Sequence, residues 1–224
     1  MSAAVVRHPA RYSDAILRTI APYVADYPVI LDPFAGTGRV HELRRVAGVE
    51  HTIGVELEAE WAAMHPDTIH GDALQLPELV GVGTVDAIVT SPAYGNRMAD
   101  HHEARDGSRR NTYRHALGRQ LTDGNAGAMQ WGTEYREFHW IVWALAVLAL
   151  RDGGRFVLNV KNHIRAGVEQ PVAEWHRDVL ERIGMVLVAS ERIPTRGLAM
   201  GRNAELRTPC EMVYVFDKPS AVDE

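Results

Sequence analysis

Short apolar runs alternate with amphipathic stretches along most of the 224-residue chain. Runs of β-branched and apolar residues that end in polar or turn residues predict strands. The predicted strands span residues 28–31, 51–55, 68–70, 85–90, 155–160, 185–193 and 211–216. Apolar positions at helical spacing predict helices over residues 11–24, 38–46, 58–64, 134–150 and 169–183. This alternation predicts an α/β fold with a doubly wound, mainly parallel seven-stranded sheet that helices cover on both faces.

The last two predicted strands break the alternation. Only a loop over residues 194–209, without a helical pattern, separates residues 185–193 from residues 211–216. We therefore expect these two strands to pair antiparallel, so that the sheet includes a final antiparallel strand. The length suits a single domain over residues 1–224.

Composition and charge exclude several classes of protein. The net charge of −5 excludes a polybasic nucleic-acid binder, so any basic contact surface must be local. A single cysteine, Cys210, excludes a disulfide framework and a multi-cysteine metal site; we expect it to be buried and structural, in a cytoplasmic protein. The apolar run over residues 140–150 is far shorter than the roughly 20 residues of a membrane span, so no membrane contact is expected. This run predicts a buried helix, with a dimer face as the alternative, which leaves a monomer and a homodimer both open.

A long segment over residues 95–132 shows no sustained periodicity. Residues 95–121 of this segment contain six arginines and three acidic residues, which gives a local net charge of +3 in an acidic chain. Such a loop is typical of a functional insertion or lid, although a solvated surface excursion is the alternative. The arginines expected to contact nucleic-acid phosphates are Arg97, Arg105, Arg109, Arg110 and Arg114.

The sequence Asp32-Pro33-Phe34-Ala35-Gly36-Thr37-Gly38 directly follows the first predicted strand and precedes a helix. We call residues 32–38 the cofactor loop. Its glycines allow a tight turn and close approach to a ligand, and the helix start offers free N–H groups. Glu56 lies 20 residues past Gly36, at the end of the second strand, where a carboxylate can accept hydrogen bonds from ribose hydroxyls.

Acidic residues at three successive strand ends narrow the choice of cofactor. Asp32 would repel a pyrophosphate, and the third glycine of the dinucleotide fingerprint is missing. S-adenosylmethionine instead offers an ammonium group, a ribose and an adenine, which suit Asp32, Glu56 and Asp72 in turn. For each carboxylate taken alone, a helix cap or a solvated side chain is the alternative.

The sequence Ser91-Pro92-Ala93-Tyr94, here called the SPAY motif, follows the fourth predicted strand. With the cofactor loop, it resembles the S-adenosylmethionine-dependent DNA amino-methyltransferases that act on adenine N6 and cytosine N4, in a minimal form without a large recognition domain. The resemblance runs from residues 8–12 to residues 210–216 and implies a Rossmann-like methyltransferase fold. The cofactor contacts that it implies are Tyr12, Asp32, Pro33, Phe34, Ala35, Gly36, Gly38, Glu56, Asp72 and Ala73.

The resemblance also implies a chemistry. A flipped DNA base would receive the methyl group directly, with the Ser91 hydroxyl and the Pro92 carbonyl accepting hydrogen bonds from its amine and Tyr94 stacking on its ring. The chain departs from the family at Ala93, where a second proline is usual, which removes one fixed φ angle. Two alternatives stay open: an RNA base N-methyltransferase, and an inactive module that binds S-adenosylmethionine or nucleic acid.

Three further patterns are weaker. Pro209-Cys210 precedes the last strand, which is the wrong place for the cysteine nucleophile of cytosine C5-methyltransferases. His101-His102-Glu103 matches half of a zinc deaminase signature, but one cysteine cannot complete it, and we propose no metal site. The polar residues that end the fifth strand either help to shape a target pocket or form a structural turn; they are Asn159, Lys161, Asn162 and His163.

Overall fold

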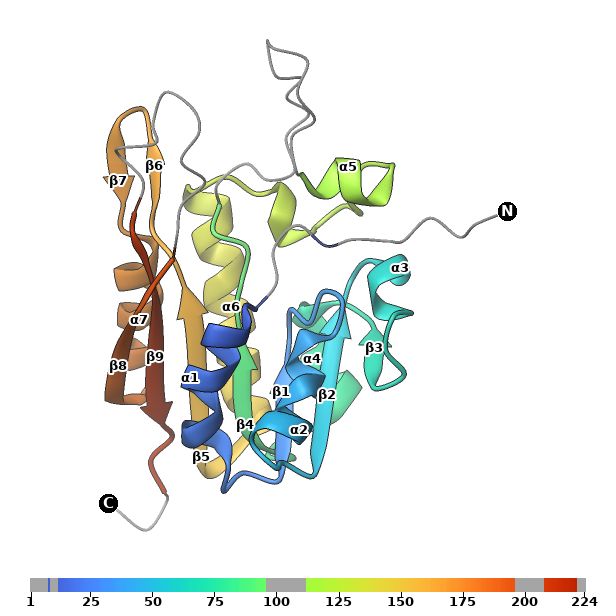
Figure 1. Ribbon diagram of the computed structural model, residues 1–224, viewed down its shortest axis with the longest axis vertical. Helices are drawn as coiled ribbons and strands as arrows, with labels where there is room; N and C mark the ends of the chain where they lie inside the picture. Colours follow the sequence, from blue (N-terminus) through green and yellow to red (C-terminus); the bar gives the residue numbers. More distant parts are fainter. Residues whose placement is uncertain (1–7, 9–11, 96–111, 196–207, 221–224) are drawn as a thin grey trace.

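Seven strands form one sheet in the order β3-β2-β1-β4-β5-β9-β8 in the computed structural model, which describes residue 8 and residues 12–95, 112–195 and 208–220 (Figure 1). The strands are β1 (Val29–Asp32), β2 (His51–Glu56), β3 (Thr68–His70), β4 (Val85–Thr90), β5 (Leu150–Val160), β8 (Val186–Pro194) and β9 (Cys210–Asp217). The first five pair in parallel, and β9 is antiparallel to both β5 and β8. The expected mainly parallel sheet with a final antiparallel strand is confirmed.

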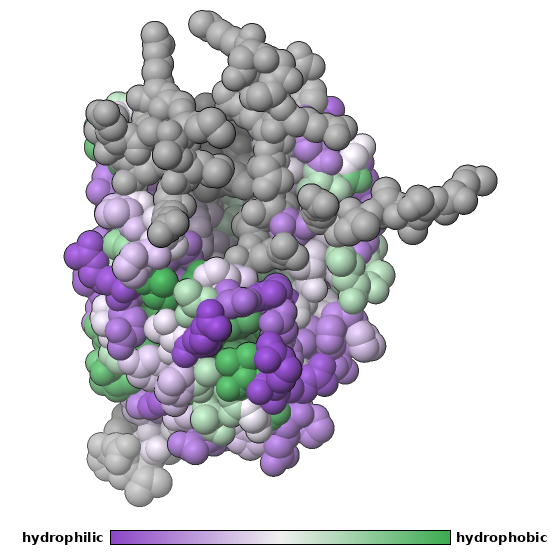
Figure 2. Space-filling view, viewed as in Figure 1, coloured by the Kyte–Doolittle hydropathy of each residue, from purple (hydrophilic) through white to green (hydrophobic). Residues whose placement is uncertain are grey.

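Helices cover both faces of this sheet (Figure 1). One face carries α1 (Asp14–Val24), the 3₁₀ helix η1 (Arg39–Glu42) and α2 (Leu43–Val46). The other carries α4 (Leu76–Val80), α6 (Thr133–Ala149) and α7 (Val172–Arg182), while α3 (Ala59–Ala62) follows β2. On the face with α1 and α2, hydrophilic residues prevail at the surface (Figure 2), and an ion pair between Arg39 and Asp14 joins η1 to α1.

The pleat of the strands builds two cores. Successive strand side chains point to opposite faces, so Ile30 packs with α1 while the adjacent Leu31 packs with α6. Trp143 of α6 lies edge-on to Phe156 of β5 with ring centroids 5.5 Å apart, and both are fully buried. Burying each side chain of this size stabilises the fold by roughly 1.5–3 kcal/mol. Packing of the strands against both helical layers therefore stabilises the sheet.

The predicted helix over residues 169–183 is wrong at its start. Residues 163–170 form a hairpin of β6 (His163–Arg165) and β7 (Val168–Gln170), and α7 begins only after Pro171. The two-residue loop has positive φ at both positions, 51° at Ala166 and 79° at Gly167, as type I′ hairpins require. Alanine gives no sequence signal for this conformation.

The sequence pattern did not predict several short elements or their exact bounds. The predicted helix over residues 38–46 is η1 followed by α2, and the one over residues 58–64 shortens to α3. The structure adds α4, α5 (Tyr113–Leu117), η2 (Ala73–Gln75) and η3 (Ala126–Ala128), all of five residues or fewer. Within the described ranges, none of the helices has the length and apolarity that crossing a membrane requires.

The order of the strands decides where a ligand can bind. From β1 the chain first proceeds outward through β2 and β3, then returns to the other side of β1 with β4. Loops at the carboxyl ends of β1 and β4 therefore diverge, which opens a crevice at that edge of the sheet. The cofactor loop follows β1 and the SPAY motif follows β4, so both lie at this crevice.

Candidate active site

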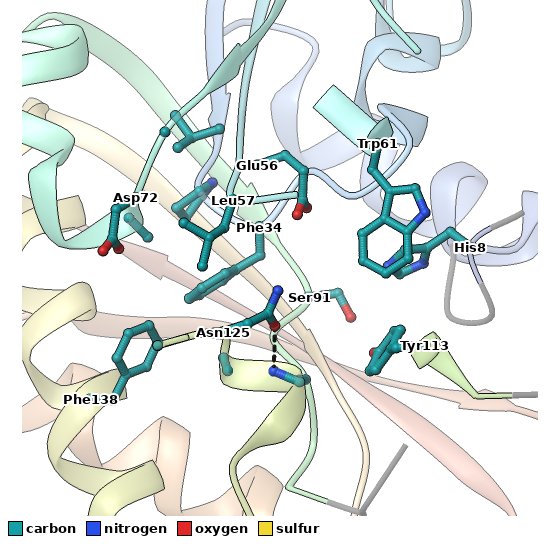
Figure 3. A pocket seen from close by; sticks show the side chains of 18 residues that line it. His8, Phe34, Glu56, Leu57, Trp61, Asp72, Ser91, Tyr113, Asn125 and Phe138 are labelled. Carbon is teal, nitrogen blue, oxygen red and sulfur yellow. Dashed lines mark hydrogen bonds between the residues drawn. The ribbon is translucent and has the colours of Figure 1, made fainter. Parts of the chain in front are cut away.

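A hollow of ≈ 590 Å³, open to solvent, lies at the carboxyl edge of the sheet (Figure 3). Residues after β1, β2, β3 and β4 form one side, and residues of α5, η3 and the first turns of α6 close the other. Its lining includes Pro33, Phe34, Glu56, Leu57, Asp72, Ala73, Ser91 and Ala93 from the strand ends, and Tyr113, Asn125, Ala126, Gly127 and Phe138 from the opposite side.

The carboxylate of Asp32 stabilises the start of the cofactor loop. Its fully buried carboxylate accepts hydrogen bonds from the Phe34 N–H at 3.0 Å, the Thr90 hydroxyl at 2.9 Å and the Tyr12 hydroxyl at 3.2 Å. Burial disfavours its charge and raises the pKa of Asp32 to about 7. Asp32 therefore ties the start of the loop to β4 and to the residues that precede α1, and it does not itself line the hollow.

Glu56 reaches the hollow from the end of β2. Its carboxylate accepts the Gly36 N–H and the Glu58 N–H, each at 2.8 Å, and burial raises its pKa to about 7. Gly36 has φ +54°, and a Cβ there would lie 3.3 Å from the His8 ring. The glycine thus allows the loop to turn while its N–H points at Glu56. Each carboxylate oxygen of Glu56 keeps acceptor capacity for a further donor.

Gly38 has a different neighbourhood. It has φ +79° at the start of η1, and a Cβ there would meet the His41 ring at 2.8 Å. His41 stacks on His65 at 3.7 Å, and both could share a metal ion with Asp67. The guanidinium of Arg44 already lies there, 2.7 Å from Asp67 Oδ2 and 3.4 Å from His65 Nε2. The cationic side chain of Arg44 thus occupies this cluster, so we propose no metal site there.

Aromatic side chains form two walls of the hollow (Figure 3). His8, Trp61 and Tyr113 pack together on one side, with ring centroids 4.3 to 5.8 Å apart. Phe34 and Phe138 lie on the other, 6.2 Å apart. None of Trp61, Tyr113 and Phe138 was expected at the site, because an aromatic residue in a loop or on a helix has the same sequence signal whether it faces a core or a ligand.

Glu58 holds the loop that closes the hollow. Its fully buried carboxylate accepts four hydrogen bonds, from Arg119 Nη2 at 2.7 Å, Thr122 N at 2.8 Å, Thr122 Oγ1 at 3.0 Å and Asn125 Nδ2 at 2.7 Å. Asn125 in turn accepts the Gly127 N–H at 2.8 Å (Figure 3). Because Asn125 and Gly127 line the hollow, one buried carboxylate after β2 sets the position of the opposite wall.

Ser91 lies in a polar cluster with Tyr94, Asn159 and Glu211. The Ser91 hydroxyl lies 3.1 Å from the Tyr94 hydroxyl, and either of the two can donate to the other. Asn159 Nδ2 donates to Glu211 at 2.9 Å and to Ser91 Oγ at 3.3 Å. When Ser91 donates to Tyr94, its Oγ keeps one lone pair for a donor in the hollow that Ser91 lines.

Comparisons with known proteins agree on the fold. Neither the family models nor the curated sequences that were searched match the chain. Among solved structures, a SAM-dependent methyltransferase from Archaeoglobus fulgidus is similar over 91% of this chain and 92% of its own, with a TM-score of 0.57 and 14% identity. A second from Mesorhizobium loti is similar over 90% and 95%, with a TM-score of 0.51 and 14% identity. TrmN from Thermus thermophilus is similar over 96% of this chain but 51% of its own, with a TM-score of 0.54 and 15% identity.

The chain has the fold of S-adenosylmethionine-dependent methyltransferases. Within this methyltransferase fold, the structure brings six of the expected site residues together around the hollow: Pro33, Phe34, Glu56, Asp72, Ala73 and Ser91. Ala35, Gly36 and Pro92 lie in the same loops but outside the lining, and so does Tyr94, whose hydroxyl turns toward Ser91. Stacking of Tyr94 on a base and contact of Asp32 with a cation stay predictions.

The expected phosphate contacts lie mostly outside the described residues. Arg97, Arg105, Arg109 and Arg110 fall within residues 96–111, which the structure does not describe, as does the sequence 101–103. Arg114 lies on α5, next to Tyr113 of the hollow. Arg119, counted in the local positive charge, is paired with Glu58 and Glu60.

The polar residues at the end of β5 were expected either to shape a target pocket or to form a structural turn, and their contacts differ. Asn159 joins the Ser91 cluster, whereas Asn162 Oδ1 accepts the Ala173 N–H at the start of α7, at 2.7 Å. Lys161 donates to Thr195 Oγ1 at 2.6 Å. Cys210 is buried at the start of β9, as expected, with Arg192 Nη2 donating to its sulfur at 3.4 Å.

The hollow suits S-adenosylmethionine in the chemistry of its side chains. Glu56 offers carboxylate oxygens to hydroxyl groups, and Phe34, Leu57 and Phe138 offer apolar surface to a purine. Asp72 lies at the rim, where Oδ1 caps the Leu74 N–H at 2.9 Å and its other oxygen is available to a donor. Buried Trp61 Nε1, which has no hydrogen-bond partner among the described residues, provides a further donor in the wall.

Proposed function

We propose that the protein transfers the methyl group of S-adenosylmethionine to the exocyclic amine of adenine or cytosine in DNA. The observation that carries this proposal is the polarity of the Ser91 cluster. With its hydroxyl donating to Tyr94, Ser91 presents an Oγ lone pair at the edge of the hollow that it lines. An aryl amine needs such an acceptor, since its nitrogen is a poor nucleophile while its lone pair is conjugated with the ring.

Bound S-adenosylmethionine supplies an electrophilic methyl group on a positively charged sulfur. Ser91 Oγ accepts one N–H of the target amine, and the Pro92 carbonyl accepts the other. Two acceptors on one nitrogen draw its hydrogens out of the ring plane, so the lone pair leaves conjugation and is directed at the methyl group. Orientation and fixed dipoles of this kind lower the barrier without a covalent nucleophile.

Residues on the other side of the hollow hold the cofactor in this proposal. Glu56 accepts hydrogen bonds from the ribose hydroxyls, and Asp72 accepts one from the adenine amine. Phe34 and Phe138 enclose the purine. Arg114, with Arg97, Arg105, Arg109 and Arg110, neutralises phosphates of the substrate strand.

A direct assay tests the proposal. The purified protein is incubated with methyl-labelled S-adenosylmethionine and unmodified DNA or RNA, and the labelled nucleosides are identified by mass spectrometry. N6-methyladenine or N4-methylcytosine from DNA alone is the expected result. Label in RNA alone would move the substrate to an RNA base, and cofactor binding without label would refute the transfer.

Two variants connect the assay to the site. Ser91→Ala removes the acceptor and should lower kcat by roughly 100-fold with little change in cofactor affinity. Ser190→Ala, which removes an exposed hydroxyl of β8, should leave both unchanged and serves as the matched control. Equal activity of the two variants would rule out the role proposed for Ser91.

A further inference from the structure

The carbonyl of Ala93 accepts a hydrogen bond from the Tyr135 hydroxyl at 2.5 Å. Ala93 is the position where the SPAY motif lacks the second proline of the family that it resembles, and it lines the hollow two residues after Ser91. We propose that Tyr135 is a positioning residue whose hydroxyl fixes the SPAY backbone at the place where a second proline would otherwise restrain it. The assignment rests on the function proposed above.

A series of hydrogen bonds that begins in the core sets the direction of the bond from Tyr135 to Ala93. The Trp143 indole N–H can only donate, and it donates to His176 Nδ1 at 2.8 Å. Neutral His176 must then carry its hydrogen on Nε2, which faces the Tyr135 hydroxyl at 2.9 Å. Since His176 donates to the Tyr135 oxygen, the single hydroxyl hydrogen of Tyr135 is free for the Ala93 carbonyl.

The side chains that form this series of hydrogen bonds are buried. Tyr135, Trp143 and His176 are each 0% exposed, so water does not compete for the hydrogen bonds between them, whereas the bond to the Ala93 carbonyl is part-buried. Burial also lowers the pKa of His176 well below its ordinary value, which keeps the ring neutral and the series in one direction. Hydrogen bonds in such a series polarise one another and strengthen the last one.

A second contact fixes the residue that follows the motif. The Trp131 N–H donates to the Gly95 carbonyl at 3.1 Å, and a Cβ at Gly95 would lie 2.7 Å from Trp131 N. Residues 131–135, which lead into α6, therefore hold the chain at both residue 93 and residue 95. α6 lies behind the sheet beside α7, which carries His176 (Figure 1).

The two restraints act on adjacent backbone angles at Ala93. A proline at position 93 would fix its own φ near −65° through its ring. The Tyr135 hydroxyl instead fixes the orientation of the peptide plane that contains the Ala93 carbonyl, because that oxygen must point at the hydroxyl. Either restraint limits how far Ser91 can move relative to the hollow.

The test combines Tyr135→Phe with Ala93→Pro. Tyr135→Phe removes only the hydroxyl; we expect amide hydrogen exchange at Tyr94, Gly95 and Trp131 to rise about 5-fold or more, as one hydrogen bond is lost. On the labelled-cofactor assay, kcat should fall about 10-fold with the KM for the cofactor unchanged. Adding Ala93→Pro should restore both toward the wild type. Tyr23→Phe, which removes a hydroxyl bonded to Glu191 far from the motif, should change neither.

Each outcome decides the assignment. Unchanged exchange in Tyr135→Phe would overturn it, and so would a double variant that exchanges as fast as the single one. Thermal unfolding identifies a variant that fails to fold, in which case Ala93→Pro alone still tests the assignment, since the restraint that it adds should leave exchange at the motif no faster than in the wild type. If the wild-type protein methylates no nucleic acid, the proposed function fails while the exchange measurements still decide the role of Tyr135.

Discussion

Neutralising Glu58 should loosen the wall of the hollow and weaken cofactor binding. The perturbation is Glu58→Gln, which keeps the shape of the side chain and replaces one acceptor oxygen with an amide NH₂. Each carboxylate oxygen accepts two of the four hydrogen bonds from the loop. An NH₂ in place of Oε1 loses the bonds from Thr122 N and Asn125, whereas an NH₂ in place of Oε2 loses the bond from Arg119, since the Thr122 hydroxyl can reverse and accept. In either orientation the charge that strengthens the bond from Arg119 is lost as well.

The magnitude follows from these contacts. One or two lost hydrogen bonds cost about 1 kcal/mol each, and loss of the charge adds about 1 kcal/mol more, for a total of about 2–3 kcal/mol. Arg119 is 40% exposed and can turn to water, which keeps the cost at the lower end. A loss of about 2 kcal/mol corresponds to roughly 30-fold in the equilibrium between the closed and open wall. The cofactor Kd should rise by about 3- to 30-fold, depending on how firmly the wall is closed in the wild type.

Glu60→Gln is the matched control, because Glu60 binds the same arginine. Its carboxylate accepts from Arg119 Nε at 2.8 Å and from Nη2, but it is 41% exposed and contacts no residue of the wall. Exposed pairs of this kind contribute about 0–1 kcal/mol, so cofactor affinity should change less than about 3-fold.

Calorimetric titration with S-adenosylmethionine measures the affinity, and amide exchange at Thr122 measures the wall without any ligand. Exchange at Thr122 should accelerate in Glu58→Gln and stay near the wild-type rate in Glu60→Gln. The reasoning would be refuted if both variants lost affinity equally, or if the Thr122 amide kept its protection in Glu58→Gln.

Two more predictions concern charge at the site. Burial raises the pKa values of Asp32 and Glu56 to about 7, above the unfolded value of about 4. The folded protein then binds these protons more tightly, so its free energy of unfolding should fall as the pH rises from about 4 to 7 and level off above. Affinity for the cationic cofactor should rise as the pH passes through about 7, where the carboxyls of the folded protein ionise. A flat profile in urea unfolding and calorimetry would contradict the assignment. Glu211→Gln replaces the carboxylate that holds the Asn159 amide, which also donates to Ser91 Oγ, and should lower kcat about 10-fold with cofactor Kd unchanged. A variant with full activity in the labelled assay would show that this hydrogen-bond network does not contribute to the activity.

The sheet was predictable because its strands are local signals. A strand that is buried on both faces is a short apolar run, as at residues 85–90, and its place in a βα unit follows from the helix after it. The loop after β1 was predictable for the same reason, since strand, glycine turn and helix are contiguous. The hairpin of β6 and β7 was missed because its turn places an alanine at positive φ, against the ordinary preference of that residue.

The residues that support the site were not predictable from the sequence. Glu58 contacts residues 61 to 67 positions later, Asn159 contacts Glu211 52 positions later, and Tyr135 contacts Ala93 42 positions earlier. No period or motif connects such pairs, because the fold alone brings them together. What the sequence did mark were residues at the ends of strands, among them Ser91, Glu56 and Asp72, and Asn159 as a residue of a target pocket or a structural turn, without its contact to Glu211.

Arg119 shows why a local count of charge misjudges such a segment. Over residues 95–121 its charge adds to the net +3, which favours a surface for phosphates. In the fold, however, Glu58 and Glu60 from beyond β2 neutralise it, and its role is to hold the wall of the hollow. The same reasoning applies to Ala93. The missing proline weakens the motif when only neighbouring residues are considered, yet a hydroxyl from α6 restrains the same backbone. A catalytic loop can therefore lose a local restraint without losing its geometry, provided that the fold supplies another from a distant part of the chain.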